Sequence, residues 1–257
     1  MRFASLGSGS RGNATVVASG DTRLLLDCGF SLKETITRLA RLGLDGGDLD
    51  AIIVTHEHAD HINGVGALAR KFDLPVWMTP GTWQVAAKHN GAGHLCVEPF
   101  SSHTAFTIKD IHIQPFPVPH DAREPSQFVF SNGDWRIGVL TDTGSSTAHI
   151  ETSLSGCHAL VLECNHDRDM LLNSHYPESL KQRIGGRYGH LDNTTAAAIL
   201  AKLDNSKLQH LVAAHLSEKN NTPYLACTAL GAVLGCALSW LQVADQDRGL
   251  GWRELRH

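Results

Sequence analysis

The segment THEHADH, residues 55–61, stands at the end of a short, nearly continuous apolar run. It is an HxHxDH pattern with three histidines and two acidic side chains. In an extended chain, residues i and i+2 lie on the same face, so His56 and His58 can point at one metal ion. The chain then turns, so that Asp60 and His61 can face a second ion. Imidazole and carboxylate ligands together suit Zn²⁺, Mn²⁺ or Fe and do not choose among them.

Two ions need more ligands than this segment supplies, and three further apolar runs end in suitable residues. His120 follows a proline-held run, Asp142 ends the run 137–141, and His215 ends the run 211–214. Each residue alone would be an ordinary turn residue. Taken together with the HxHxDH segment, they predict a metal site at the edge where several strands end.

Strand and helix patterns alternate in both halves of the chain, which predicts two sheets sandwiched between helical layers. We expect strands over 2–6, 14–18, 22–27, 50–55, 75–78, 135–141, 159–163 and 208–214. We expect helices over 31–42, 62–72, 83–89, 146–154 and 193–203. The region 105–141 is β-rich, and Asn132-Gly133 predicts a hairpin within it.

Composition is that of an ordinary globular protein. The chain has 257 residues, 42% hydrophobic and 19% charged, with a formal net charge of −4. This balance excludes disorder, a collagen-like repeat or a coiled coil as a description of the whole chain. The mild acidity argues against coating nucleic acid by bulk charge alone, although it is compatible with a local basic groove. Sixteen histidines against eight phenylalanines favour a metal enzyme.

The six cysteines form no CxxC pair, and the N-terminus lacks the apolar run of a secretory signal. We therefore expect reduced thiols and a cytoplasmic protein. The uncharged stretch from Leu225 to Ala244 is long enough to cross a bilayer. Because glycines interrupt it, we expect instead a helix that begins at Pro223 and stops at Gly235, a strand over 238–243, and no membrane span.

With these residues together, the sequence resembles the metallo-β-lactamase superfamily over almost its whole length. The resemblance implies a single domain, residues 1–257, with the αββα four-layer sandwich of metallo-β-lactamases and RNase Z and no appended β-CASP or other domain. It implies two divalent ions, with zinc or manganese favoured. One ion would be bound by His56, His58 and His120, and the other by Asp60, His61 and His215, with Asp142 as the bridge. Asp27 matches a carboxylate of the superfamily that orients the metal loop, a role that suits a carboxylate behind a ligand.

Further segments resemble the WalJ/YycJ-type group, which is associated with exonuclease activity on DNA. They are SGSRGNA (8–14), ECNHD (163–167), the segment 176–184, GHLDN (189–193) and HLSEKNN (215–221). The resemblance implies a 5′–3′ exonuclease with DNA as the favoured partner. Asp192 departs from the group, which usually has serine there, and an extra carboxylate at this position can weaken a phosphate contact.

Two cations joined by a carboxylate can hold a hydroxide that attacks phosphorus in line. Asp60 and Asp142 are then the catalytic carboxylates, and His190 is a candidate for protonating the leaving oxygen. The alternative for His190 is a structural role, as a loop residue that precedes a helix cap. Candidate substrate-binding residues are Asn165, His166, Arg168, Lys181 and Arg183, for which the alternative is an ordinary charged face.

Other hydrolases share HxHxDH. A β-lactamase is disfavoured because Asp142 is present and a secretory signal is not. A thiolesterase of the glyoxalase II type does not suit the segments around His190 and His215, and a flavin-partnered diiron oxidase would usually have Glu in place of His58. Two alternatives stay open. One is a phosphodiesterase for small cyclic phosphodiesters, and the other is a non-catalytic, metal-stabilised nucleic-acid-binding or scaffold protein.

Overall fold

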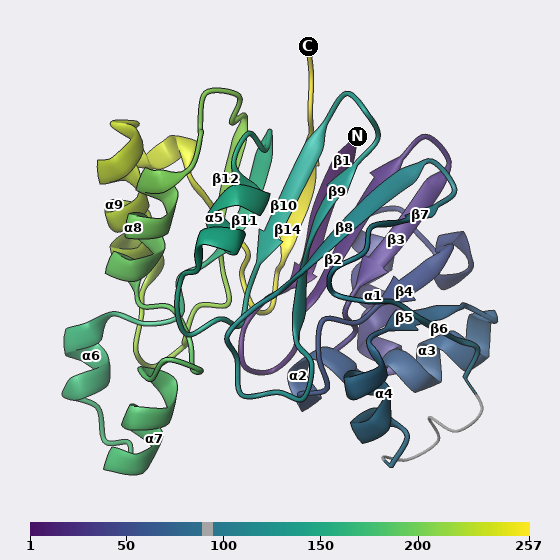
Figure 1. The fold of residues 1–257 in the computed structure, drawn as a ribbon, viewed down its shortest axis with the longest axis horizontal. Coiled ribbons are helices and arrows are strands. Elements are labelled where there is room, and N and C mark those ends of the chain that lie inside the picture. Colours follow the sequence, from purple (N-terminus) through teal and green to yellow (C-terminus); the bar gives the residue numbers. More distant parts are fainter. Residues whose placement is uncertain (89–94) are drawn as a thin grey trace.

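The computed structural model describes residues 1–88 and 95–257. Within these residues, two seven-stranded sheets pack face to face, and helices cover their outer faces (Figure 1). The layers are therefore helix, sheet, sheet and helix, and the predicted αββα sandwich is confirmed.

The first sheet has the order β14-β1-β2-β3-β4-β5-β6, antiparallel from β14 to β3 and parallel from β3 to β6. Its strands are β1 (Arg2–Gly7), β2 (Ala14–Ser19), β3 (Thr22–Leu26), β4 (Ala51–Ile53), β5 (Val76–Met78), β6 (Val97–Pro99) and β14 (Leu250–Glu254). The second sheet has the order β13-β12-β11-β10-β9-β8-β7, parallel from β10 to β13. Its strands are β7 (Phe106–Ile108), β8 (Ile111–Pro117), β9 (Ser126–Ser131), β10 (Arg136–Leu140), β11 (Ala159–Glu163), β12 (His210–Ala214) and β13 (Gln242–Val243).

The helices fall into three sets (Figure 1). The first sheet is covered by α1 (Leu32–Arg41), α3 (Val65–Phe72) and α4 (Pro80–Ala86). The second sheet is covered by α5 (Ala148–Leu154), α8 (Asn193–Lys202) and α9 (Pro223–Leu234). The short helices α2 (Ala59–Ile62), α6 (Arg168–Leu172) and α7 (Glu178–Ile184) lie at the lower end of the sandwich in Figure 1, away from both chain termini.

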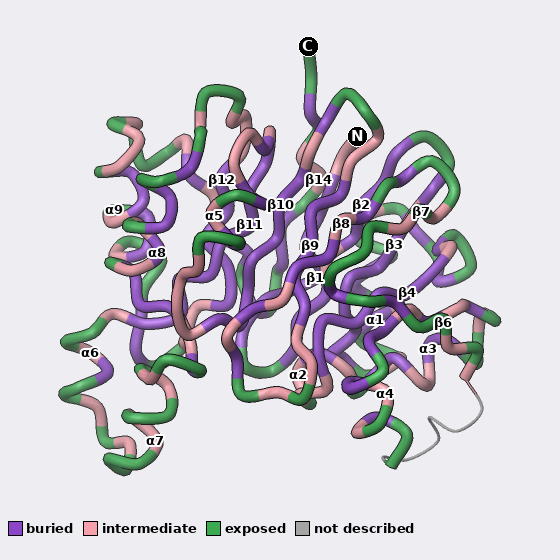
Figure 2. Tube along the Cα trace, in the orientation of Figure 1, coloured by how far each residue is buried: buried purple, intermediate pink, exposed green. Residues whose placement is uncertain are grey.

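Apolar side chains fill the three interfaces between the four layers. Figure 2 shows that the strands of both sheets are buried along most of their length. Strand β4 shows how its sequence serves two of them. Ile52 packs with the helices on the outer face, whereas Ile53 packs between the sheets. Because successive strand residues point to opposite faces, a strand buried on both sides needs a continuous apolar run, and β4 has one.

The structure corrects several predicted elements. The strand expected over 238–243 is a 3₁₀ turn at Leu238–Trp240 followed by the two-residue strand β13, because the N–H of Leu241 bonds back to the carbonyl of Leu238. The predicted helix 62–72 is divided between α2 and α3. The helix expected over 83–89 is α4, which begins earlier, at Pro80, and residue 89 lies outside the described residues. Helices α6 and α7 and strand β14 were not predicted.

Candidate metal centre

Three residues that follow β3, β10 and β12 turn their side chains toward one edge of the sandwich. They are Asp27, Asp142 and His215, with φ angles of 60°, 50° and 54°. A residue with a Cβ atom rarely adopts this left-handed conformation, which costs of order 1–3 kcal/mol. Three strand ends that meet at this edge thus each carry a residue in an unfavourable backbone conformation. Such conformations indicate that the side chains are placed for function and not for stability.

The first group of donors is His56, His58 and His120. Nδ1 of His58 lies 3.1 Å from Nε2 of His56 and 3.1 Å from Nε2 of His120. A zinc-sized ion about 2.0–2.1 Å from each nitrogen in tetrahedral geometry would separate the nitrogens by roughly 3.3 Å. The three imidazoles are therefore spaced to hold one ion.

The second group is Asp60, His61 and His215. Oδ2 of Asp60 lies 3.4 Å from Nε2 of His61 and 3.3 Å from Nε2 of His215. Asp142 lies beside this group, with Oδ2 3.1 Å from Nε2 of His61. It also belongs with His56, since donor atoms of His56, His61 and Asp142 lie within 4.8 Å of one another. The structure thus brings all seven predicted ligands together, with Asp142 between the two groups.

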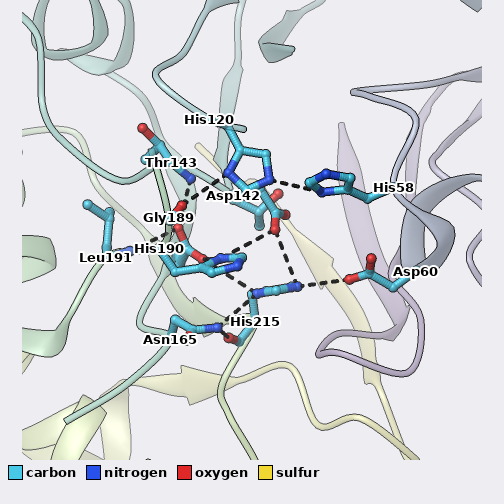
Figure 3. A network of polar contacts seen from close by, with 12 residues as sticks. His58, Asp60, His120, Asp142, Thr143, Asn165, Gly189, His190, Leu191 and His215 are labelled. Atoms are coloured by element: carbon cyan, nitrogen blue, oxygen red, sulfur yellow. Dashed lines mark hydrogen bonds and ion pairs between the residues drawn. The ribbon is translucent and has the colours of Figure 1, made fainter. Parts of the chain in front are cut away.

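The far side of four of these imidazoles is hydrogen-bonded, which aims the other nitrogen into the site. Nδ1 of His61 contacts Oδ2 of Asp27 at 2.8 Å, and Nδ1 of His56 contacts the Thr55 hydroxyl at 2.9 Å. His120 donates through Nδ1 to the Gly189 carbonyl at 3.0 Å, as Figure 3 shows. His215 has Glu163 behind it, with Oε1 3.4 Å from Nδ1, and Asn165 donates to the backbone carbonyl of His215 at 3.0 Å. Such partners fix the tautomer and the orientation of a metal-binding imidazole.

The charges of the site favour a cation. Although burial opposes ionisation, His215 and His61 hold the pKa of Asp142 well below its usual range. Burial also opposes the charge of His215, yet Asp142, with hydrogen bonds to Asp60 and Glu163, raises its pKa to about 10. A divalent ion would replace the protons that these imidazoles otherwise carry. Oδ2 of Asp142 is buried, and among the described residues no contact to it, including the one from His61 at 3.1 Å, has the geometry of a hydrogen bond, which fits a carboxylate oxygen placed for a metal ion.

A turn near the N-terminus supports the metal loop. Asn13 points its amide nitrogen at Oδ2 of Asp60, 3.2 Å away, and accepts from the N–H of Gly9. Gln246, in the loop before β14, bonds to the same turn through the N–H of Arg11 at 2.8 Å and the carbonyl of Gly12 at 2.9 Å. These contacts join segments far apart in the chain, so local sequence patterns do not predict them.

Gly29 lets the backbone approach this loop closely. A Cβ atom at this position would lie 1.8 Å from the carbonyl oxygen of Asp60, so any other residue would push the loop away.

His190 lies beside Asp142 and is held by a carboxylate that the sequence analysis did not single out. Glu163, at the end of β11, is fully buried and contacts Nδ1 of His190 at 2.8 Å. Its second oxygen accepts from the N–H groups of Thr143 and Leu191. The sequence contains a signal for Glu163, because this acidic residue ends an apolar strand, which is the pattern that predicted Asp142.

A cavity of about 290 Å³ opens over these groups. Its lining residues are Ser10, His58, Ala59, Asp60, Asp121, Asp142, Arg183, Ile184, Gly189, His190 and His215. Both candidate metal groups and His190 therefore face one space that a substrate can enter.

Of the predicted substrate-binding residues, Arg183 alone lines this cavity. Arg168 pairs with Asp192 at 3.0 Å, and Lys181 donates to a backbone carbonyl at the end of α6. Asn165 and His166 are buried outside the lining, which leaves them supporting positions.

Asp192 accepts hydrogen bonds from the N–H groups of Thr194 and Thr195 and caps α8. The departure from the group's usual serine thus places a helix cap here and adds no carboxylate to the cavity lining.

The chain belongs to the metallo-β-lactamase superfamily: the family described as "Beta-lactamase superfamily domain" matches residues 22–215. This match confirms the predicted superfamily, and the chain is a metal-dependent hydrolase. The fold and the clustered His and Asp donors imply divalent metal ions.

Two relatives are similar over nearly the whole chain. Exodeoxyribonuclease YycJ of Bacillus anthracis is 38% identical over 91% of this chain and 89% of its own length. Exodeoxyribonuclease WalJ of Streptococcus pneumoniae is 34% identical over 98% and 91%, respectively. The predicted resemblance to the WalJ/YycJ-type group is confirmed.

Among solved structures, Zn²⁺-bound PqqB from Methylobacterium extorquens has a TM-score of 0.76 at 18% identity, covering 99% of this chain and 100% of its own. The short form of human tRNase Z has a TM-score of 0.69 at 15% identity, covering 100% of both chains. These likenesses show the fold alone. In the part of the chain that the structure describes, none of the helices has the length and hydrophobicity to cross a membrane.

Proposed function

We propose that this protein is a DNA exonuclease that hydrolyses phosphodiester bonds with two divalent ions. The observation that carries the proposal is the pair of three-residue donor groups joined by Asp142 on the floor of one cavity. The names of the two relatives that match nearly the whole chain point to DNA ends as the substrate.

In this proposal, His56, His58 and His120 would hold one ion and Asp60, His61 and His215 would hold the other, with Asp142 placed between the two groups. Bound ions of this kind supply a strong nucleophile from water and neutralise charge on the phosphate. Zinc and manganese both suit the mixed imidazole and carboxylate donors.

His190 is the proposed donor of the proton that the leaving oxygen needs. Its Nδ1–H donates to Glu163, so Nε2 is the nitrogen left for a substrate in the cavity. A carboxylate behind an imidazole favours the protonated form and fixes its direction, as general acid catalysis requires.

The decisive experiment offers the metal-loaded protein a panel of end-labelled duplex DNA, single-stranded DNA, RNA and small cyclic phosphodiesters, with Mn²⁺ or Zn²⁺. Stepwise shortening of DNA from an end is expected, and 5′- and 3′-labelled strands report the polarity. D142N should lose this activity, whereas D134N, which makes the same change in an exposed hairpin turn, should keep it. Turnover confined to cyclic phosphodiesters would replace the exonuclease by the small-molecule phosphodiesterase. DNA binding without turnover would favour the scaffold protein.

A further inference from the structure

Arg183 is the one Arg or Lys among the described residues that lines the cavity. It comes from the end of α7, and its side chain is 63% exposed. Its Nε donates to Oδ2 of Asp121 at 2.7 Å. Within the described residues, its two terminal nitrogens have no hydrogen-bond partner, so they are available to a ligand.

Other cations near the site are already engaged. Arg11 lies between two carboxylates, 2.6 Å from Glu218 and 2.9 Å from Asp247. Lys181, on the same helix as Arg183, donates to the carbonyl of Leu172 at 2.6 Å. Among the described residues, only Arg183 combines a place in the cavity wall with terminal nitrogens that have no hydrogen-bond partner.

Asp121 ties this arginine to the metal centre. It directly follows His120, and its carbonyl oxygen lies 3.2 Å from Nε2 of His58. Its N–H donates to the carbonyl of Tyr188 at 3.0 Å, which anchors the segment after α7. The carboxylate of Asp121 thus fixes the guanidinium at a set position relative to the imidazoles of His58 and His120.

We propose that Arg183 binds a phosphate of the substrate strand next to the phosphodiester that reacts, and that Asp121 is the positioning residue that holds its guanidinium. This inference rests on the proposed phosphodiester substrate. A guanidinium with one edge fixed can offer its terminal nitrogens to two phosphate oxygens at once. A cation at this position also offsets the carboxylates of Asp60, Asp121 and Asp142, which would otherwise repel the strand.

The test measures binding and turnover separately in R183Q, D121N and the double variant. R256Q is the matched control, because Arg256 pairs with Glu254 at 3.0 Å near the C-terminus, at the opposite end of the molecule. Binding of a fluorescent single-stranded oligonucleotide with hydrolysis-resistant phosphorothioate linkages by the metal-loaded protein is followed by anisotropy at several salt concentrations. Losing one phosphate contact should reduce the slope of log K against log salt by about 0.7 in R183Q. R256Q should keep the wild-type slope.

In kinetics with the metal-loaded protein, R183Q should raise KM for DNA about tenfold or more, with a smaller change in kcat. D121N should raise KM by less, and adding it to R183Q should have little further effect, because both changes remove the same contact. If Asp121 had only a structural role, D121N would lower the stability of the protein, and its effect on KM would be the same in the presence and in the absence of Arg183. Comparing DNA strands that carry a 5′-phosphate with strands that carry a 5′-hydroxyl shows whether Arg183 binds a terminal or an internal phosphate. A rise in KM of R183Q with either kind of strand supports the contact.

An unchanged binding slope in R183Q overturns the inference, whatever the activity. If the wild type does not degrade DNA, the proposed function fails, and the binding slope still decides whether Arg183 contacts phosphate.

Discussion

Replacing Glu163 by Gln tests the proposed role of His190 most sharply. The side chain is fully buried and accepts hydrogen bonds at 2.8 Å from His190, 3.0 Å from the N–H of Thr143 and 3.3 Å from the N–H of Leu191. Its Oε1 also lies 3.4 Å from Nδ1 of His215, so the metal content of the variant has to be measured with its activity. Glutamine has nearly the same shape. Its amide oxygen can still accept from the two backbone groups, which leaves the amide N–H₂ facing Nδ1 of His190.

Nδ1 must then accept a hydrogen bond, so the proton of the imidazole moves to Nε2 and the ring stays neutral. A neutral imidazole is a far weaker acid than the imidazolium that a carboxylate favours. We expect kcat on DNA to fall by about 10²-fold, since general acid catalysis contributes about 10²- to 10⁴-fold. The free energy of unfolding should fall by about 1.5–3 kcal/mol, the contribution of a hydrogen bond to a charged group.

The assay compares DNA with bis(p-nitrophenyl) phosphate, whose leaving group departs without a proton. E163Q should lose much less activity on the nitrophenyl ester than on DNA, and metal analysis should find the wild-type content. E151Q, which removes a carboxylate from a surface ion pair with Lys202, is the matched control. Equal losses on both substrates at full metal content would refute the reasoning, because proton donation would then not be what Glu163 supports.

Four further variants or treatments test other parts of the structure. D142N should reduce the metal content from about two ions per chain as well as abolish hydrolysis, and full loading measured by metal analysis would contradict the bridging position. Removing the ions with a chelator should lower the melting temperature, because ions at a thousand times their Kd add about 4 kcal/mol of stability. R38M should lower the free energy of unfolding in urea by about 2–3 kcal/mol, since buried Arg38 donates to three backbone carbonyls that methionine leaves unpaired; an unchanged midpoint would show that these contacts add nothing. Burial opposes ionisation of Asp192, but hydrogen bonds from Thr195 and Arg168 lower its pKa, so its contribution is present above about pH 4 and is lost as the pH falls through the lowered value. The destabilisation in D192N should thus be about 0.5–1 kcal/mol at pH 7 and shrink below pH 4 in pH-dependent denaturation; a pH-independent difference would argue against a charge effect.

The sequence was sufficient to predict the strand ends that meet at the site. His56 and His58, and the residues after β10 and β12, each follow an apolar run, and such runs are local signals. Local signals do not say which strand ends lie at the same edge of the sandwich. The resemblance to the superfamily, through its fold, supplied that arrangement. Glu163 carries the same local signal and was nevertheless not singled out.

Other features could not be predicted from local patterns. Asn13 contacts Asp60 across 47 positions of the chain, and β14 pairs with β1 from the opposite end of the sequence. Helices α6 and α7 are too short to show an apolar period, and α7 has no buried residue. Arg183 is distinctive because its terminal nitrogens have no hydrogen-bond partner within residues 1–88 and 95–257, which only the three-dimensional arrangement reveals.

The support of the N-terminal turn by Gln246 has a consequence for the order of synthesis. The ribosome has made every proposed metal ligand once it reaches His215, but the loop that holds the turn and the strand β14 come later. Because segments fold from the N-terminus onward during synthesis, the growing chain carries all the donors while Asn13 still lacks the support of Gln246. Hydrolytic activity should therefore appear only after residues 245–254 have been made, and chains that stop before Gln246 should be inert toward nearby nucleic acid.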